Sequence, residues 1–334
     1  MTLSPGIKNK LAVATVSLGR HPSHTLERKI QAVAKYGFQG IELVHADLIS
    51  HAQAKNQTPL EAAREVKALC KAASIEVLTL SPLRHFEGNL VEPLELRLKN
   101  AQEWVELAVA AGAGIVQMPS QFLPGPGAAT GDDAVIIPEL RALADMAAEK
   151  GVSIGYEAVA FGRFQRTWQD ALRVVEAVGR PNFGLCLDSF HVHSLVWADA
   201  YTPTGRLENG DDELQRSMRE FLHRCPRDKV LWIQLSDASR FDPPLTDESP
   251  LFKGVEVHDA NLVWSRFARP FPLESPGYYP VADIARTWIL EFGWDGWVSL
   301  EGFLDETHLE ANGPEAMAER AKVSINKLSA ALGL

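Results

Sequence analysis

The chain has 334 residues, more than a typical single domain, and length alone does not decide between one domain and two. Hydrophobic residues make up 46% of the sequence and charged residues 23%, an ordinary balance for a globular protein with a large core. The formal net charge is -10, and neither terminus carries a run of Lys and Arg. These properties exclude a disordered chain and argue against a nucleic-acid partner. A small anionic substrate remains open, because a few arginines in a cleft can set the local potential.

The cysteines and the N-terminus indicate where the protein resides. Cys70, Cys186 and Cys225 are widely spaced and include no CxxC pair, so neither a disulfide framework nor a thiolate zinc site is expected. The segment Met1–Lys10 has no apolar core of signal-peptide length, and no run approaches the roughly 18 apolar residues of a membrane span. We therefore expect a cytoplasmic protein without a membrane segment. The oligomeric state, a homo-oligomer included, is left open.

Short apolar runs rich in β-branched residues alternate with helical-period stretches along the whole chain, which is typical of repeated βα units around a parallel sheet. The alternation predicts a (β/α)8 barrel formed by a single domain over residues 1–334. The predicted strands are Leu11–Leu18, Gln39–His45, Ile75–Ser81, Ile115–Pro119, Val152–Ala158, Asn182–Asp188, Lys229–Ser236 and Gly296–Glu301. The predicted helices are His24–Tyr36, Pro59–Ala73, Pro93–Ala111, Ala134–Lys150, Trp168–Val178, Asp212–His223, Val281–Phe292 and Pro314–Leu332.

Two predicted connections are unusually long. Leu123–Asp133 follows the fourth strand, and Asp237–Tyr279 follows the seventh. In a barrel both would lie on the face formed by the carboxyl ends of the strands, where long loops usually form the walls or lid of a site.

Polar side chains close four consecutive predicted strands. Strands five to eight end in Glu157, Asp188, Gln234 and Glu301. The carboxyl ends of barrel strands meet at one face, and three carboxylates with one amide oxygen would repel there unless a cation lay among them. All-oxygen ligation suits a hard divalent ion, whereas zinc is less favoured without thiolate or imidazole ligands. The sequence therefore predicts a divalent metal site, with Mg²⁺, Mn²⁺ and Co²⁺ as the ions to test.

Any one of these acids has an alternative explanation as a helix cap or a partner of a nearby arginine. Caps need no common focus and no amide among them, so four such residues on consecutive strands favour metal binding. His191 lies three residues past Asp188, and we predict it in the loop after strand six, as the general base. A loop histidine bonded to a backbone carbonyl is the alternative, and it applies more strongly to His193.

Further polar residues near predicted strand ends suggest substrate contacts. Glu42 is another strand-end acid and a candidate catalytic residue, with His45 close behind it. The predicted substrate-binding residues are His45, Arg84, Ser265, Arg266 and Arg269. The planar fork of arginine pairs well with a carboxylate, so these arginines predict a small anionic substrate, although surface ion pairs would explain them too.

Several runs resemble known proteins. The segments Glu157–Gly162 and Arg180–His191 resemble the xylose isomerase-like TIM barrels. The resemblance narrows to the fungal-type 3-dehydroshikimate dehydratases of quinate catabolism through Val16–Gly19, Phe38–Glu42, Leu80–Arg84, Trp264–Arg269 and Trp297–Glu301. It spans nearly the whole chain, and the Trp-Ser-Arg segment with the long seventh loop favours the narrower family.

The resemblance implies that Glu157, Asp188, Gln234 and Glu301 are the metal ligands and that His191 acts on the substrate. Some relatives carry His where this chain has Gln234, which leaves the identity of the metal open. The implied reaction is the elimination of water from 3-dehydroshikimate to give protocatechuate.

Three other classes of function are alternatives. A metal-dependent sugar or hydroxy-acid isomerase or epimerase would use the same ligands and return the proton instead of expelling water. A barrel endonuclease would need a His-rich zinc cluster and a basic face, neither of which the sequence shows. A sugar-binding barrel without activity would tolerate the loss of His191.

Overall fold

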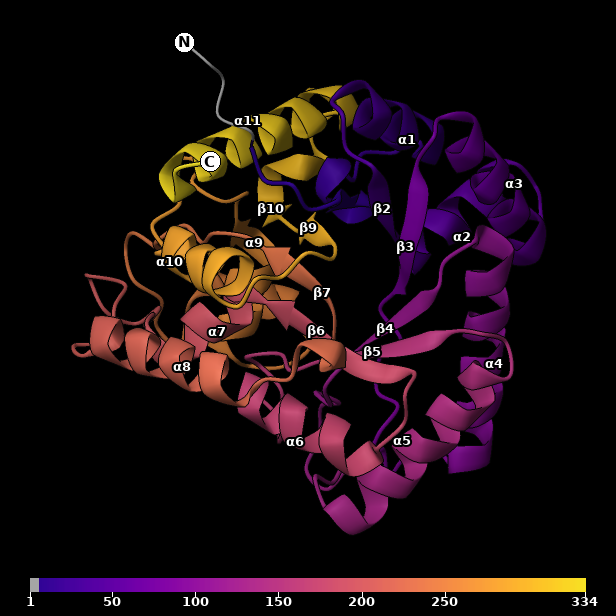
Figure 1. The fold of residues 1–334 in the computed structure, drawn as a ribbon, viewed down its shortest axis with the longest axis horizontal. Coiled ribbons are helices and arrows are strands. Elements are labelled where there is room, and N and C mark those ends of the chain that lie inside the picture. The colour runs from indigo at the N-terminus through magenta and orange to yellow at the C-terminus, as the bar shows by residue number, and fades with distance from the viewer. Residues whose placement is uncertain (1–5) are drawn as a thin grey trace.

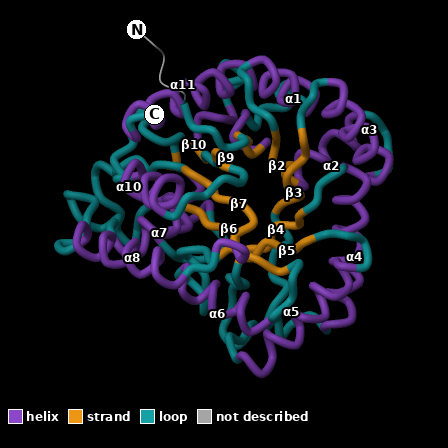
Figure 2. The backbone as a smooth tube through the Cα atoms, viewed as in Figure 1, coloured by secondary structure: helices purple, strands orange, loops and turns teal. Residues whose placement is uncertain are grey.

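The computed structural model describes residues 6–334, so the first five residues of the segment examined for a signal sequence lie outside it. Eight parallel strands close into a barrel in the order β1-β2-β3-β4-β5-β6-β7-β9. Figures 1 and 2 show these strands at the centre and the helices around them. The barrel strands are β1 (Leu11–Ala14), β2 (Gly40–Val44), β3 (Glu76–Ser81), β4 (Ile115–Pro119), β5 (Ser153–Glu157), β6 (Phe183–Asp188), β7 (Val230–Leu235) and β9 (Val298–Leu300). The predicted barrel is confirmed.

The helices are α1 (Leu26–Lys35), α2 (His45–Ala54), α3 (Pro59–Ala72), α4 (Leu94–Ala111), α5 (Asp133–Ala148), α6 (Trp168–Val178), α7 (Ser189–Val196), α8 (Gly210–Arg224), α9 (Ala260–Phe267), α10 (Val281–Ala285) and α11 (Pro314–Leu332). Local signals set several of their ends. Thr58 and Thr167 each form a capping box at the start of a helix, and Gly179 ends α6 in the left-handed conformation. The last helix, α11, lies beside α1 and closes the ring (Figure 1).

Three helices differ from the sequence prediction. His45 was expected in a strand but begins α2, and α9 lies within the long connection after β7. His191 was predicted in a loop, yet it lies in α7, so that part of the prediction was wrong. The cause is local: the carboxylate of Asp188 accepts a hydrogen bond from the backbone N–H of Phe190 at 2.8 Å, which caps a helix beginning directly at the strand end.

The barrel interior is apolar at one end and polar at the other. Ala12, Leu78, Cys186 and Trp232 form a buried apolar cluster, in which the indole of Trp232 is fully buried. A Cβ at Gly155 would lie 2.2 Å from that indole, so glycine at this position makes room for it. This cluster fills the barrel below the strand ends and leaves the polar residues gathered at the carboxyl end.

The two long connections form part of the carboxyl-terminal face, as expected. The one after β7 carries β8 (Ala268–Arg269), which pairs antiparallel with β10 (Phe303–Leu304) in the segment after β9. This pairing places Arg269 beside the ends of β6 and β9. None of the helices in residues 6–334 is long and apolar enough to cross a membrane.

Candidate metal centre and active site

The strand ends supply a set of buried acids on one face of the barrel. Glu157 is the last residue of β5 and Asp188 the last of β6, while Glu301 directly follows β9. Gln234 in β7 pairs in register with Asp188. Since each side chain extends from the carboxyl end of a parallel strand, the fold itself brings these groups to one region.

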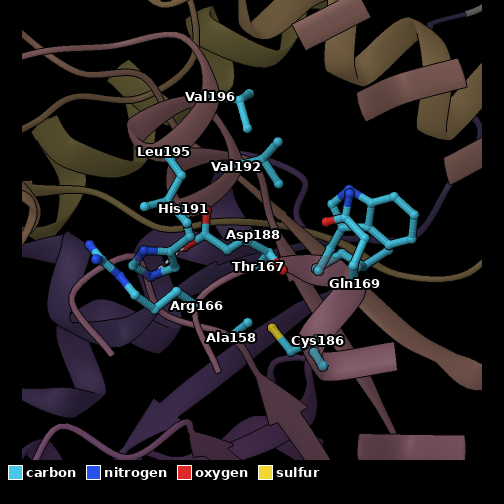
Figure 3. A pocket seen from close by; sticks show the side chains of 13 residues that line it. Ala158, Arg166, Thr167, Gln169, Cys186, Asp188, His191, Val192, Leu195 and Val196 are labelled. Carbon is cyan, nitrogen blue, oxygen red and sulfur yellow. Dashed lines mark ion pairs between the residues drawn. The ribbon is translucent and has the colours of Figure 1, made fainter. Parts of the chain in front are cut away.

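Glu157, Asp188 and His191 form the tightest part of the set. Nε2 of His191 lies 3.6 Å from Oε1 of Glu157 and 3.7 Å from Oδ2 of Asp188. One ligand atom from each of the three residues lies within 4.8 Å of the others, and all three side chains are buried. Figure 3 shows Asp188 and His191 lying together, next to Arg166 and Thr167. These four residues line a small cavity of about 20 Å³.

The electrostatics of these acids are those of an incompletely neutralised cluster. Burial raises the pKa of Glu157 well above its usual range, and the charges of Asp188 and Glu301 add to the shift. Burial also raises the pKa of Asp188, and it raises that of Glu301 to about 8, against the opposing charge of Arg269 in both cases. Burial and mutual repulsion thus oppose the ionised forms of these carboxylates, and Arg269 offsets only part of that effect.

Arg269 supplies part of that charge. Its Nη2 donates a short hydrogen bond to Asp188 and lies 3.0 Å from Oε2 of Glu301. Its Nε donates to Oγ of Ser236 at 2.9 Å. The guanidinium lies over the ring of Phe190 at 4.5 Å, and the side chain is 1% exposed. Arg269 thus links two of the predicted metal ligands from a fixed position.

The donor set fits a divalent cation. Carboxylate oxygens of Glu157 and Asp188 lie within 4.8 Å of each other, and the single guanidinium of Arg269 does not balance these two carboxylates together with that of Glu301. Hard divalent cations take such oxygen ligands. The structure thus brings Glu157, Asp188 and His191 together. Glu301 is connected to this group through the guanidinium of Arg269, which contacts both Glu301 and Asp188. The assignment of the four ligands stays a prediction.

Gln234 and Glu42 lie deeper in the barrel and contact each other. Nε2 of Gln234 donates to Oε1 of Glu42 at 2.9 Å, and the thiol of Cys186 lies 3.2 Å from Oε1 of Gln234. The hydroxyl of Thr79 donates to Oε2 of Glu42 at 3.2 Å. Burial raises the pKa of Glu42, and hydrogen bonding by Ser299, Gln234 and Thr79 partly offsets this shift. Whether Glu42 is catalytic stays a prediction.

The hydrogen bond to His191 decides where its proton lies. The backbone N–H of Ala160 donates to Nδ1 at 3.1 Å, so Nδ1 must carry a lone pair. Burial lowers the pKa of His191 well below its usual range, with Arg269 adding to the shift, so the ring is neutral. A neutral ring with Nδ1 as acceptor carries its proton on Nε2. The side chain therefore presents an N–H to Glu157 and Asp188, which favours proton donation over the predicted role as base.

A cavity of about 280 Å³ opens in front of the cluster. Glu157, His191 and Glu301 line it together with the predicted substrate-binding residues Arg84, Ser265, Arg266 and Arg269. Among the residues that the structure describes, its lining does not include His45, whose ring stacks on that of Trp104 with 4.3 Å between the centroids. The rest of the wall is mainly apolar and includes Val16, Val44, Pro82, Pro119, Phe122, Val159, Phe161 and Phe303.

Sequence reasoning missed two polar contacts of the site. Nε2 of Gln117 in β4 donates a short hydrogen bond to Glu157. A glutamine inside an otherwise apolar strand was a usable signal. Glu256 in the long connection after β7 lies 2.9 Å from Nη2 of Arg266 and 3.6 Å from Nη1 of Arg84. No sequence pattern marks this residue, because its role depends on how the loop folds back.

The fold defines a (β/α)8 barrel, and the acidic cluster is a candidate active site at the carboxyl ends of its strands. The sequence model of the family described as xylose isomerase-like TIM barrel matches residues 30–327, and the chain belongs to this family. The chain is 33% identical over 340 residues to a Neurospora crassa protein named 3-dehydroshikimate dehydratase, covering 96% of this chain and 93% of that protein. The predicted family resemblance is thereby confirmed.

Two further similarities involve longer proteins. A Pseudomonas aeruginosa protein with the same name is 33% identical over 294 residues, which cover 88% of this chain. The chain spans only 38% of that relative. A solved fusion protein, described as a xylose isomerase-like TIM barrel joined to a 4-hydroxyphenylpyruvate dioxygenase, superposes with a TM-score of 0.73 at 28% identity. The match covers 95% of this chain and 42% of the fusion protein, so the similarity concerns the barrel part.

Proposed function

We propose that this protein is a 3-dehydroshikimate dehydratase, a hydro-lyase that converts 3-dehydroshikimate to protocatechuate and water with the help of a divalent cation. The observation that carries the proposal is the buried cluster of Glu157, Asp188 and His191, which opens into a cavity lined by arginines. The chain also matches a relative named 3-dehydroshikimate dehydratase over 96% of its length, which supports the choice of substrate.

The cation would be held by oxygens of Glu157, Asp188, Gln234 and Glu301, and Mg²⁺, Mn²⁺ or Co²⁺ suits this donor set. When bound, it supplies Lewis-acid stabilisation of the negative charge that develops on the ketone oxygen of the substrate. Arg269 keeps Asp188 and Glu301 in place through its contacts to both. Gln117 does the same for Glu157.

The substrate carboxylate would bind between Arg84 and Arg266. Both guanidinium groups line the cavity, and both already lie close to one carboxylate, that of Glu256. Glu256 comes from an exposed loop position, so an incoming carboxylate can replace it. The rings of Phe122, Phe161 and Phe303 offer apolar surface to the flat part of the substrate ring.

The reaction requires loss of a proton from C4, next to the ketone at C3, and departure of the hydroxyl on C5. His191 carries its proton on Nε2, so it protonates the leaving hydroxyl, which departs as water. With the cation bound, Glu157 and Glu301 would be ionised, and the C4 proton would pass to an oxygen of one of these two wall residues that does not hold the cation. Tautomerisation, in which C6 loses a proton and the C3 oxygen gains one, then gives the aromatic product and makes the overall reaction strongly favourable.

The test is to incubate the purified protein with 3-dehydroshikimate and Mg²⁺, Mn²⁺ or Co²⁺ and to follow the ultraviolet absorbance of protocatechuate. We expect product with at least one ion and none after treatment with a chelator. Absence of product with every ion would refute the proposal. Metal-dependent exchange of a substrate proton without loss of water would favour an isomerase or epimerase instead.

A further inference from the structure

Glu42 occupies a position that separates it from the substrate. It lies in β2, is 1% exposed, and does not belong to the cavity lining among residues 6–334, although Val44 of the same strand does. Any role of its side chain must therefore come from contacts inside the barrel. There it contacts Gln234, one of the predicted metal ligands.

The contact between the two side chains has a direction. Oε1 of Glu42 accepts a hydrogen bond from Nε2 of Gln234 at 2.9 Å, and Oε2 accepts one from the hydroxyl of Thr79 at 3.2 Å. An ionised carboxylate has no hydrogen to donate, so the amide turns its nitrogen towards ionised Glu42, as the observed hydrogen bond has it. The oxygen of Gln234 is thereby held at the opposite end of the amide. There its contact is the thiol of Cys186, a weak donor that leaves a second lone pair free.

This direction matters for a cation, because hard divalent ions bind the amide oxygen and are repelled by amide N–H groups. We infer that Glu42 is a positioning residue that fixes the amide of Gln234 with its oxygen available to the cation. The inference rests on the proposed function only for the presence of that cation. It assigns Glu42 no contact with the substrate.

Substituting Glu42→Met tests the inference, because methionine keeps the length of the side chain and removes the acceptor. We expect the affinity for Mn²⁺ to fall by about 10- to 100-fold, as measured from the electron paramagnetic resonance signal of free Mn²⁺. The matched control is Thr79→Val, which removes the hydrogen bond from Thr79 to Glu42 and leaves the contact of Glu42 with Gln234. Its Mn²⁺ affinity should stay within about 3-fold of the wild type. An unchanged affinity in a folded Glu42→Met variant would overturn the inference.

An exchange of the two residues provides a test that does not depend on how well methionine is tolerated. In the double variant Glu42→Gln with Gln234→Glu, the hydrogen bond is reversed and the charge of the pair is conserved. The residue at 234 then presents oxygen in either orientation, so Mn²⁺ affinity should return to within a few fold of the wild type. A double variant that binds Mn²⁺ more than about 10-fold more weakly than the wild type would contradict the inference.

The same variants separate the positioning role from the catalytic role predicted from the sequence. If Glu42 acted on the substrate, Glu42→Met would lose kcat at saturating Mn²⁺ with unchanged Mn²⁺ affinity, and the exchange would not restore turnover. Because Mn²⁺ binding is measured without substrate, its outcome stands even if 3-dehydroshikimate proves not to be the substrate.

Discussion

Replacing Glu256 with glutamine should lower the KM for 3-dehydroshikimate, whereas replacing either arginine that it contacts should raise it. Glu256 lies 2.9 Å from Arg266 and 3.6 Å from Arg84, so the substrate carboxylate must displace it to bind there. The side chain of Glu256 is 42% exposed, and ion pairs exposed to that degree contribute no more than about 1 kcal/mol. Removing this competition should therefore lower KM by up to about 5-fold.

The arginines should act in the opposite direction and more strongly. Charge-assisted hydrogen bonds to a substrate carboxylate contribute about 1.5–3 kcal/mol, so Arg84→Met or Arg266→Met should raise KM by roughly 10- to 150-fold. The two arginines would contact the substrate carboxylate, which lies away from the reacting carbons C4 and C5. We therefore expect kcat to change little. Steady-state kinetics at saturating metal measures both constants. Glu248→Gln, an exposed acid of the same loop, is the control and should leave KM unchanged. A KM unaffected by Glu256→Gln and by both arginine substitutions would refute a carboxylate site at this pair.

Other predictions address the proton of His191, the acidic cluster and a buried acid outside it. Nitrogen-15 NMR of the metal-free protein should show His191 neutral at pH 6 with its proton on Nε2; a proton on Nδ1 would contradict the hydrogen bond from Ala160. Asp188→Asn should abolish metal-dependent turnover while thermal unfolding still shows a cooperative fold, and a fully active variant would remove Asp188 from the site. Burial raises the pKa of Glu87 to about 7 from an ordinary 4.5, so the folded state favours its neutral form. Stability from this group is complete below about pH 4.5 and lost as pH rises to 7, by about 3 kcal/mol. In urea unfolding, the free energy of unfolding of Glu87→Gln, relative to that of the wild type, should therefore be higher at pH 8 than at pH 5. An equal difference between variant and wild type at both pH values would refute this.

Most of the barrel could be predicted because its strands are short apolar runs that are easily recognised in the sequence. An apolar run such as Ile115–Pro119 has few alternatives, and its predicted bounds are those of β4. Repetition of strand and helix along the chain then leaves the barrel as the natural arrangement. The acids at strand ends could be found for the same reason, since the fold class alone places Glu157 and Asp188 on one face.

The rest depends on contacts that no local pattern records. His191 was expected in a loop because it lies only three residues past the strand end, but the side chain of Asp188 starts the eight-residue helix α7 there. The stacking of His45 on Trp104 joins segments far apart in the sequence and moves the imidazole out of the cavity lining. The tautomer of His191 follows from a single backbone N–H, that of Ala160, which becomes visible only once the loop after β5 is in place.

The central claim is that one divalent cation is bound where β5, β6, β7 and β9 end. Anomalous diffraction from a crystal grown with Mn²⁺ tests it most directly. The account predicts a single strong peak within coordination distance of oxygens of Glu157, Asp188, Gln234 and Glu301, with Nε2 of His191 outside the ligand shell. A catalytically active crystal with Mn²⁺ bound elsewhere, or with no peak among these side chains, would contradict it.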